Sequence, residues 1–471
     1  FEMINNRVTE GLFQIESNLF KQLIKEIRPD NFNDIIALTS IARPGPLNAG
    51  MHTAYGRRKH GEEKAVEPLK NTWDVTKNSY GTIIYQEQIM QIAKIVAGVD
   101  DNQADSYYRK AIAKKRKSMM ELCRQWFIYG KINEEPPIDY NETNKNQPMY
   151  DPENKYGNPI KGGINNGYDE QELSDFWVKM EGYASYLFNL SHAVSYSFIT
   201  IACAYLKKYH TKEYMANLLS ITEKEEDKEK YIEASEKLGI KIVHPDINKS
   251  EINFAVKDGK IIYGLSSIKG VGENKIIEII NNRPYKNLSD IHQKLSKKIL
   301  DKRVGKALIK AGCFDFENSN RISMLNQFII LRNIKKELEE ELEDENSYNK
   351  TTCMQFERET LSTEITHKPW WKKIKSGNKI CENFTIETVS EIYDKNKKLM
   401  AFATGESNGC MIEMVIFSSI YRKAHEFVNS DKYKTIKITG KKDENGKLIV
   451  SNIKPTIELS KNNIDKLASV I

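Results

Sequence analysis

The residues best suited to chemistry in this 471-residue chain form a dense group of cations. Six Lys and Arg residues occupy nine positions over Arg109–Lys117, and no acidic residue interrupts the stretch from Ser106 to Met120. So many positive charges in so short a segment favour contact with a polyanion such as a phosphate chain. A solvated helix face is the alternative that the run by itself leaves open.

Two polar segments lie on either side of this basic run in the sequence. Tyr85–Gln88 (YQEQ) follows an apolar stretch about 25 residues upstream, and Asn189–His192 (NLSH) lies about 75 residues downstream. Side chains of these types can contact bases, sugars and phosphates. Together with the basic run they predict a site for phosphates and bases.

Helices are the elements that we expect to position these residues, because apolar residues recur at helical spacing through most of residues 1–130. Positions 19, 23, 24 and 27 form one apolar face, which Pro29 ends. Residues 131–166 are polar and rich in Asn, Pro and Gly, which predicts an irregular surface insertion. Helices are predicted again over Glu170–Gly182 and Ser195–Ser220.

A glycine-rich turn at Ile268–Gly272 has the sequence of the hairpin in a helix-hairpin-helix motif. Both glycines would allow a tight turn and would leave N–H groups at the next helix start free to bind a DNA phosphate. A second unit at Leu308–Asp315 supports this prediction, and a hairpin that only packs remains the alternative. The candidate DNA-binding residues are Lys269, Gly270, Val271, Gly272 and Lys275.

Composition favours a soluble multidomain protein of a reducing compartment. The net charge is only +6, the six cysteines form no CxxC pair, and the longest apolar run is too short to span a membrane. Residues 334–346 predict an acidic helix or linker, and five short strand patterns after residue 382 predict a small barrel. The first residue is Phe1, so we expect the chain to start inside a longer coding region.

Several motifs resemble, in order, those of the bacterial C-family replicative polymerases, the DNA polymerase III alpha subunits. The resemblance covers about residues 7–315 and continues more loosely through the strand-rich region, which is similar to the family's oligonucleotide-binding barrel. The matching segments are GLFQIES at 11–17, ARPGPL at 42–47, RKHG at 58–61, YGTIIYQEQ at 80–88, MQIA at 90–93, RKAIAKK at 109–115, FNLSHA at 188–193, PDIN at 245–248 and KGVG at 269–272.

The resemblance implies a multidomain protein that is mainly α through its fingers and helix-hairpin-helix parts and ends in a small all-β OB-like barrel. Expected domains are fingers at 1–220, including a palm-edge remnant and the insertion 131–166, a tandem helix-hairpin-helix DNA-binding domain at 221–315, a helical linker at 316–380 and an OB-fold-like domain at 381–471.

The implied function is DNA-directed DNA polymerase activity, a nucleotidyl transfer, in which this chain binds an incoming dNTP and primer–template DNA during replication. Its cations would neutralise the triphosphate, whose charge grows in the transition state. They could instead contact the DNA backbone, and the tyrosines and His192 could be structural. The nucleotide-binding candidates are Arg43, Tyr85, Gln86, Arg109, Lys110, Lys114, Lys115, Asn189, Ser191, His192 and Tyr196.

Three positions depart from the family pattern. Lys110 replaces an arginine and lacks its bidentate fork. Leu190 replaces a lysine, and Ala113 replaces a glycine.

Phosphoryl transfer to a 3′-hydroxyl needs two divalent metal ions, which carboxylates hold. The family places these acids in a palm D-x-D element and a later Asp, all before the equivalent of Gly11. We therefore predict no catalytic residue and no metal ligand here. The Mg²⁺ ligands would come from a palm-containing N-terminal half, without which this chain would be inactive.

Partners implied by the resemblance are primer–template DNA, a dNTP, the palm half, the sliding clamp and other replisome proteins, and no membrane. No Gln-x-x-Leu-Phe-like clamp peptide occurs between the hairpins and the barrel. The expected location is the cytoplasm, in a bacterial nucleoid or a phage-infected cell. The alternative function is a non-catalytic DNA-binding or scaffold protein derived from a polymerase.

Overall fold

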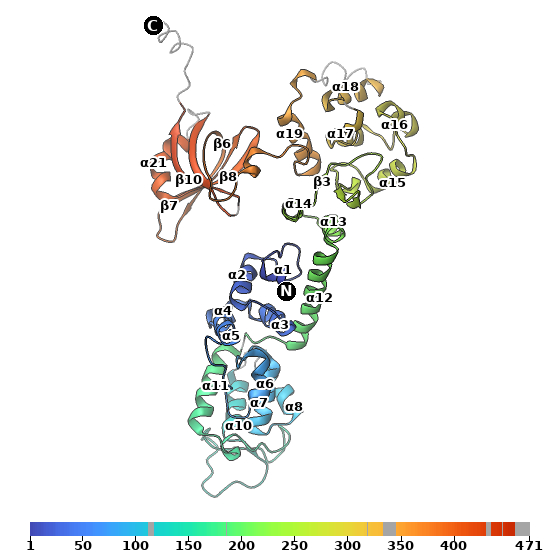
Figure 1. The fold of residues 1–471 in the computed structure, drawn as a ribbon. Helices are drawn as coiled ribbons and strands as arrows, with labels where there is room; N and C mark the ends of the chain where they lie inside the picture. The colour runs from blue at the N-terminus through green and yellow to red at the C-terminus, as the bar shows by residue number, and fades with distance from the viewer. Residues whose placement is uncertain are drawn as a thin grey trace. The chain divides into compact units, whose positions relative to one another are not determined.

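The computed structural model describes residues 1–111, 117–184, 186–317, 319–332, 345–429, 435–444 and 446–456. The chain divides into two compact units, Phe1–Tyr214 and Met215–Ile471, with the boundary in α13 (Thr211–Ile221). The first unit is helical, and the second combines helices with a closed barrel (Figure 1). The predicted fold class is therefore confirmed. None of the described helices is both long and apolar enough to cross a membrane.

One part of the first unit is built on α2 and α3, which pack against α5 and the long α12. Leu23, Ile24 and Ile27 of α2 are buried, as their spacing predicts, whereas Leu19 at the start of the helix is exposed. The helix ends at Ile27. The elements are α1 (Glu2–Asn5), α2 (Asn18–Ile27), α3 (Phe32–Ile41), α4 (Pro44–Asn48), α5 (Met51–Lys59) and α12 (Leu190–Tyr209).

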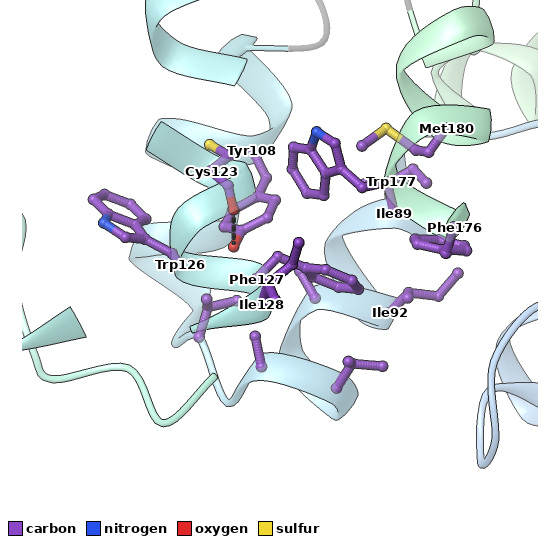
Figure 2. Packing of buried hydrophobic residues seen from close by; sticks show 14 of the residues in the cluster. Ile89, Ile92, Tyr108, Cys123, Trp126, Phe127, Ile128, Phe176, Trp177 and Met180 are labelled. Carbon is purple, nitrogen blue, oxygen red and sulfur yellow. Dashed lines mark hydrogen bonds between the residues drawn. The ribbon is translucent and has the colours of Figure 1, made fainter. Parts of the chain in front are cut away.

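A second hydrophobic cluster in the same unit is rich in aromatic side chains (Figure 2). The ring centroids of Phe127 and Trp177 are 5.4 Å apart, and the Tyr108 hydroxyl donates to the Cys123 carbonyl at 3.1 Å. The elements are α6 (Trp73–Thr76), η1 (Lys77–Ser79), α7 (Gln86–Ala97), α8 (Asp101–Gln103), the π-helix η2 (Ala104–Arg109), α10 (Lys117–Ile128) and α11 (Glu170–Ala184).

The insertion at 131–166 has little regular structure but is anchored inside the protein. Buried Lys131 forms an ion pair with buried Asp151 at 3.0 Å and donates to the Gly157 carbonyl at 2.6 Å. A buried charge is stable only when it is paired and hydrogen-bonded, so this network fixes the path of the segment. The short elements are β1 (Lys131–Ile132), β2 (Met149–Tyr150) and η3 (Ile164–Asn166).

The helix predicted over Ser195–Ser220 is two helices, α12 and α13. His210 leaves the helical conformation between them, with φ −129° and ψ 49°. The predicted acidic segment lies outside the described residues from 334 to 344.

The second unit begins with helices and a small sheet that surround the glycine-rich turn. Its strands pair in the order β3-β5-β4. The elements are α14 (Glu225–Lys237), β3 (Ile242–Val243), β4 (Ala255–Lys257), β5 (Lys260–Ile262), η4 (Leu265–Ser267), α15 (Glu273–Asn281), α16 (Leu288–Lys294), α17 (Lys302–Lys310), η5 (Asp315–Glu317), α18 (Arg321–Leu331), η6 (Glu345–Ser347), α19 (Lys350–Leu361) and α20 (Trp370–Lys373).

The five predicted strands form a closed barrel in the order β10-β8-β7-β6-β9. Strands β8 and β10 pair in parallel and the other neighbours pair antiparallel, which is an OB-like arrangement. The elements are β6 (Lys379–Tyr393), β7 (Leu399–Ser407), β8 (Cys410–Ile416), α21 (Ser418–Val428), β9 (Ile436–Lys442) and β10 (Leu448–Pro455).

Candidate nucleotide and nucleic-acid site

Two of the predicted site segments meet in a single parallel β-bridge between Tyr85 and Phe188. The Phe188 N–H donates to the Ile84 carbonyl at 3.0 Å, and the Gln86 N–H donates to the Phe188 carbonyl at 2.9 Å. Tyr85 belongs to one hydrophobic cluster and Leu187 to the other, so the bridge lies where the two clusters adjoin. Helices α7 and α12 begin within two residues of it and therefore start close together.

The side chain of Gln88 fixes the chain at this bridge. Its buried carboxamide oxygen accepts from the N–H groups of Ile84 at 2.7 Å and Tyr85 at 3.0 Å. Its NH₂ group donates to Ser79 Oγ at 2.7 Å and to the Val75 carbonyl at 3.2 Å. All four bonds orient the backbone that leads into α7. Gln88 belongs to the predicted polar segment Tyr85–Gln88 but was not among the nucleotide-binding candidates, because three polar residues in a row look alike in sequence.

The start of α12 is held by its own cap and by α7. Asn189 Oδ1 accepts from the His192 N–H at 2.9 Å and from Ser191 Oγ at 2.7 Å. Glu87 Oε2 accepts from the Leu190 N–H at 2.9 Å, and Gln86 Nε2 donates to the Leu187 carbonyl at 3.2 Å. Gln86 and Asn189 therefore position the site backbone, whichever ligand the site holds.

Arg43 reaches the bridge from the start of α4. Its guanidinium carbon lies 3.9 Å from the centroid of the Phe188 ring. Partial burial lowers the pKa of this side chain, but a guanidinium stays protonated at neutral pH. Stacking of this kind holds a planar cation in one orientation, with N–H donors at its edge.

His192 and Tyr196 follow on the first turns of α12. The His192 ring centroid lies 5.4 Å from that of Phe188 and 4.2 Å from that of Tyr196. His192 and Ser191 are exposed, whereas Tyr85 is buried, and burial raises the pKa of Tyr85. The structure therefore gives Tyr85 a packing role and leaves Ser191 and His192 accessible to a ligand.

Arg109, the first residue of the basic run, ends η2, which packs against α7. Arg109 donates to both oxygens of Asp105, at 2.5 Å and 3.0 Å. Asp105, and more weakly Glu87, raise the pKa of Arg109. Lys110 is exposed next to this pair. Lys114 and Lys115 lie outside the described residues.

The two glycines of the glycine-rich turn differ in backbone conformation. Gly270 has φ +93°, and a β-carbon there would lie 3.1 Å from Arg303 Nε. Gly272 caps α15 with φ −82°, which any residue can adopt, and open space surrounds its missing side chain. Gly270 therefore has the left-handed backbone that favours glycine, and Gly272 leaves the α15 N-terminus open.

The charges beside this turn are partly neutralised. Lys269 forms an ion pair with Glu225 at 2.6 Å, and Lys275 forms one with Asp301. A hollow of about 310 Å³ next to Gly270 is lined by three cations of α17, of which Lys310 is paired with Glu359 at 2.8 Å. They are spaced three and four residues apart on one helix face: Arg303, Lys306 and Lys310.

Acidic residues that could have been metal ligands have local structural roles. Asp100 accepts from the Gln103 N–H at 2.8 Å, and Asp101 pairs with Lys94 at 2.6 Å. Asp169 accepts from N–H groups in the first turn of α11. Within the described ranges, no group of three or more His, Cys, Asp or Glu side chains could hold a metal ion.

Comparisons with known proteins agree with the motifs. Residues 1–135 match the bacterial DNA polymerase III alpha subunit finger domain, and residues 239–324 match the helix-hairpin-helix motif. The chain is related to bacterial DNA polymerase III alpha subunits. It is 30% identical to the Aquifex aeolicus protein of that name over 98% of this chain. The Helicobacter pylori protein is 34% identical over 69% of the chain, and the Staphylococcus epidermidis protein 27% over 96%.

The family resemblance read from the motifs and the helix-hairpin-helix motif are thus confirmed. This chain spans 39% of the Aquifex protein, 25% of the Helicobacter protein and 42% of the Staphylococcus protein.

Proposed function

We propose that this chain binds an incoming dNTP and primer–template DNA in template-directed DNA synthesis, as part of a DNA polymerase III alpha subunit. One observation carries the proposal. The bridge between Tyr85 and Phe188 gathers Arg43, the start of α7 and the start of α12 at one place, although they lie far apart in the sequence. The site thus joins a fixed cation to accessible hydroxyl and imidazole groups.

Each accessible group has a role that its chemistry suits. Arg43 donates to triphosphate oxygens from its stacked position over Phe188. His192 donates to the same phosphates or to the sugar, and Ser191 does so when its hydroxyl exchanges Asn189 Oδ1 for the ligand. Arg109 at the end of η2 and Lys110 directly after it add charge, and Arg109 exchanges Asp105 for a phosphate when the nucleotide enters. Cations placed in advance stabilise the charge that develops as the phosphoryl group transfers.

The DNA is held by the second unit. The open N-terminus of α15 at Gly272 and the cations Arg303, Lys306 and Lys310 suit the phosphates of duplex product. Such contacts are independent of base sequence, and salt weakens them because each neutralised phosphate releases counterions. The OB-like barrel is proposed to hold the single-stranded template.

The metal ions of the reaction are assigned to a palm-containing N-terminal half, either joined to this chain or supplied as a separate polypeptide. Mg²⁺ prefers carboxylate ligands, and the acidic pairs described above are engaged in helix caps and ion pairs. In this proposal the chain positions nucleotide and DNA, and the palm polypeptide supplies the D-x-D acids.

Primer extension tests whether this chain only binds nucleotide and DNA while the palm supplies the metal-binding acids. The 471-residue chain with Mg²⁺, four dNTPs and a primer–template should bind both ligands without extending the primer. Adding the palm polypeptide of the same organism should give extension. Extension by the chain alone would overturn the assignment of the metal-binding acids to the palm. Binding of DNA without nucleotide binding, and without extension when the palm is present, would favour a non-catalytic DNA-binding or scaffold protein.

Charge removal in the basic run tests the nucleotide role. The double variant Lys114→Ala, Lys115→Ala, assayed with the palm polypeptide, should lose about 10²-fold in kcat/KM, or about 3 kcal/mol of transition-state stabilisation. Its duplex affinity serves as the internal control and should change little. A fall in duplex affinity with unchanged nucleotide kinetics would make the run a DNA-backbone contact instead.

A further inference from the structure

One side of the barrel carries four lysines on its outer surface. Strand β9 lies between β6 and β10, and the register of the three strands aligns their outward residues in rows. Side chains alternate along a strand, and Ile380, Ile436 and Ile438 are buried, so the residues between them point outward. We call these outward residues the β9 face. Its three rows are Lys379, Lys441 and Ile449, then Cys381, Thr439 and Asn452, then Asn383, Lys437 and Lys454.

The positive charge of the β9 face is not balanced by acidic side chains. Lys379 lies directly opposite Lys441, and Lys437 lies directly opposite Lys454. All four lysines are exposed, none of the nine residues is acidic, and within the described ranges none of the four forms an ion pair. Like charges directly opposite each other destabilise a sheet. An anion bound on this face would therefore stabilise both pairs.

The surface by which OB folds usually hold oligonucleotides has a different charge in this barrel. That surface is formed by the second and third strands, here β7 and β8, which lie across the barrel from β9. Neither strand contains Lys or Arg, and their outward residues include Glu406 and Glu413. Lys447 pairs with Glu413 at 2.7 Å. Other cations beside this surface lie in the β6–β7 turn, at Lys395, Lys397 and Lys398.

We infer that the β9 face binds the phosphate backbone of single-stranded DNA, on the side of the barrel opposite the usual OB surface. This inference rests on the proposed function, which assigns the single-stranded template to the barrel, and it names the surface. Lys437 and Lys441 are four residues apart, or about 13 Å along β9, and three neighbouring strands span about 10 Å. A flexible single strand can place successive phosphates over so small a convex area. A straight duplex meets it at fewer points.

The residues of the β9 face suit phosphates rather than bases. Asn383 and Asn452 add amide donors beside the lysines, and none of the nine residues is aromatic. Single-stranded DNA is usually held by aromatic side chains on which its bases stack. Without such stacking, binding on this face is independent of base sequence, and salt weakens it because neutralised phosphates release counterions.

Cys381 reports occupation of the β9 face directly. It is exposed on β6 beside Thr439, whereas the other five cysteines are buried or half-buried. In the full chain, N-ethylmaleimide should modify Cys381 about tenfold more slowly when oligo-dT is present at about ten times its dissociation constant, because few faces are then free. Peptide mass spectrometry measures the rate. Unchanged modification of Cys381 while oligo-dT is bound would overturn the inference.

Two competing ligands test which polyanion the face holds. A duplex of the same length should protect Cys381 less than oligo-dT does, and polyglutamate of equal charge should also protect it less. Equal or better protection by the duplex would overturn the assignment to a single strand. Equal or better protection by polyglutamate would make an acidic protein segment the occupant.

A matched pair of variants separates the β9 face from the usual OB surface. Lys437→Ser with Lys441→Ser should weaken oligo-dT binding by about tenfold or more and reduce the slope of log K against log salt by about 1.4, as two lost phosphate contacts predict. Lys395→Ser with Lys398→Ser removes the same charge from the β6–β7 turn and should weaken binding less. All four side chains are exposed, so neither variant should lower the urea midpoint. A larger loss in the turn variant would overturn the inference.

The inference and the proposed function fail separately. Protection of Cys381 by oligo-dT without primer extension, when the palm is present, would leave the β9 face standing and contradict the polymerase function. Primer extension with Cys381 unprotected would do the reverse.

Discussion

Gln88→Leu should loosen the bridge at which the site assembles. The substitution keeps a side chain of similar size but removes both hydrogen-bonding groups. Ile84 and Tyr85 lose the acceptor of their N–H groups, and Val75 loses a donor to its carbonyl. Ser79 keeps two other bonds, to the carbonyls of Thr76 and Thr82. A buried N–H without a partner costs about 1–3 kcal/mol, so two such groups predict a loss of about 3 kcal/mol.

Hydrogen exchange followed by mass spectrometry measures this loss locally. A change of about 3 kcal/mol in the opening free energy corresponds to about 10²-fold faster exchange of peptides covering residues 82–90. The dNTP affinity should fall as well, because the start of α7 loses its fixed position beside Phe188. Gln86→Leu is the matched control. It removes one bond of 3.2 Å from a half-buried side chain and should cost about 1 kcal/mol or less.

Equal acceleration of exchange in the two variants would refute this reasoning. So would an increase smaller than about threefold for Gln88→Leu, since that is less than 1 kcal/mol. Either result would mean that backbone pairing and packing hold the bridge without the carboxamide.

Other predictions concern charge, backbone conformation and pH. Arg43→Lys should weaken dNTP binding about fivefold, because an ammonium loses the planar stacking on Phe188, and titration calorimetry measures the change. Gly270→Val should destabilise the chain to urea by about 1–3 kcal/mol, because φ is +93° there, whereas Gly272→Ala should leave stability unchanged and weaken duplex binding in a salt titration. Burial lowers the pKa of Lys207 from 10.5 to about 8, so the folded state binds fewer protons than the unfolded state between these values. The unfolding free energy of the chain should therefore rise, relative to that of Lys207→Met, by about 1.5 kcal/mol from pH 8 to 9.5, and a fall over that range in urea titrations would contradict the buried placement.

The sequence by itself determined the family and the type of most elements, and it predicted the segments of the candidate site. Local patterns were enough for this, because an apolar face at helical spacing, an alternating strand and a glycine-rich turn each require a particular backbone. Leu23, Ile24 and Ile27 of α2 and the five barrel strands are where their patterns predict. The single helix predicted over Ser195–Ser220 was wrong, because the chain leaves the helical conformation at His210. No Gly or Pro near that position marks the break in the sequence.

Only the tertiary structure decided which polar residues hold the site together and which remain accessible. Gln86, Glu87 and Gln88 are neighbours in sequence, yet Gln88 is buried with four hydrogen bonds while Glu87 reaches the first N–H of α12. The stacking of Arg43 on Phe188 joins residues that are 145 positions apart. Such pairings depend on how the two hydrophobic clusters pack on either side of the Tyr85–Phe188 bridge. The partner of each side chain lies far away in the chain, so no local sequence pattern could reveal these contacts.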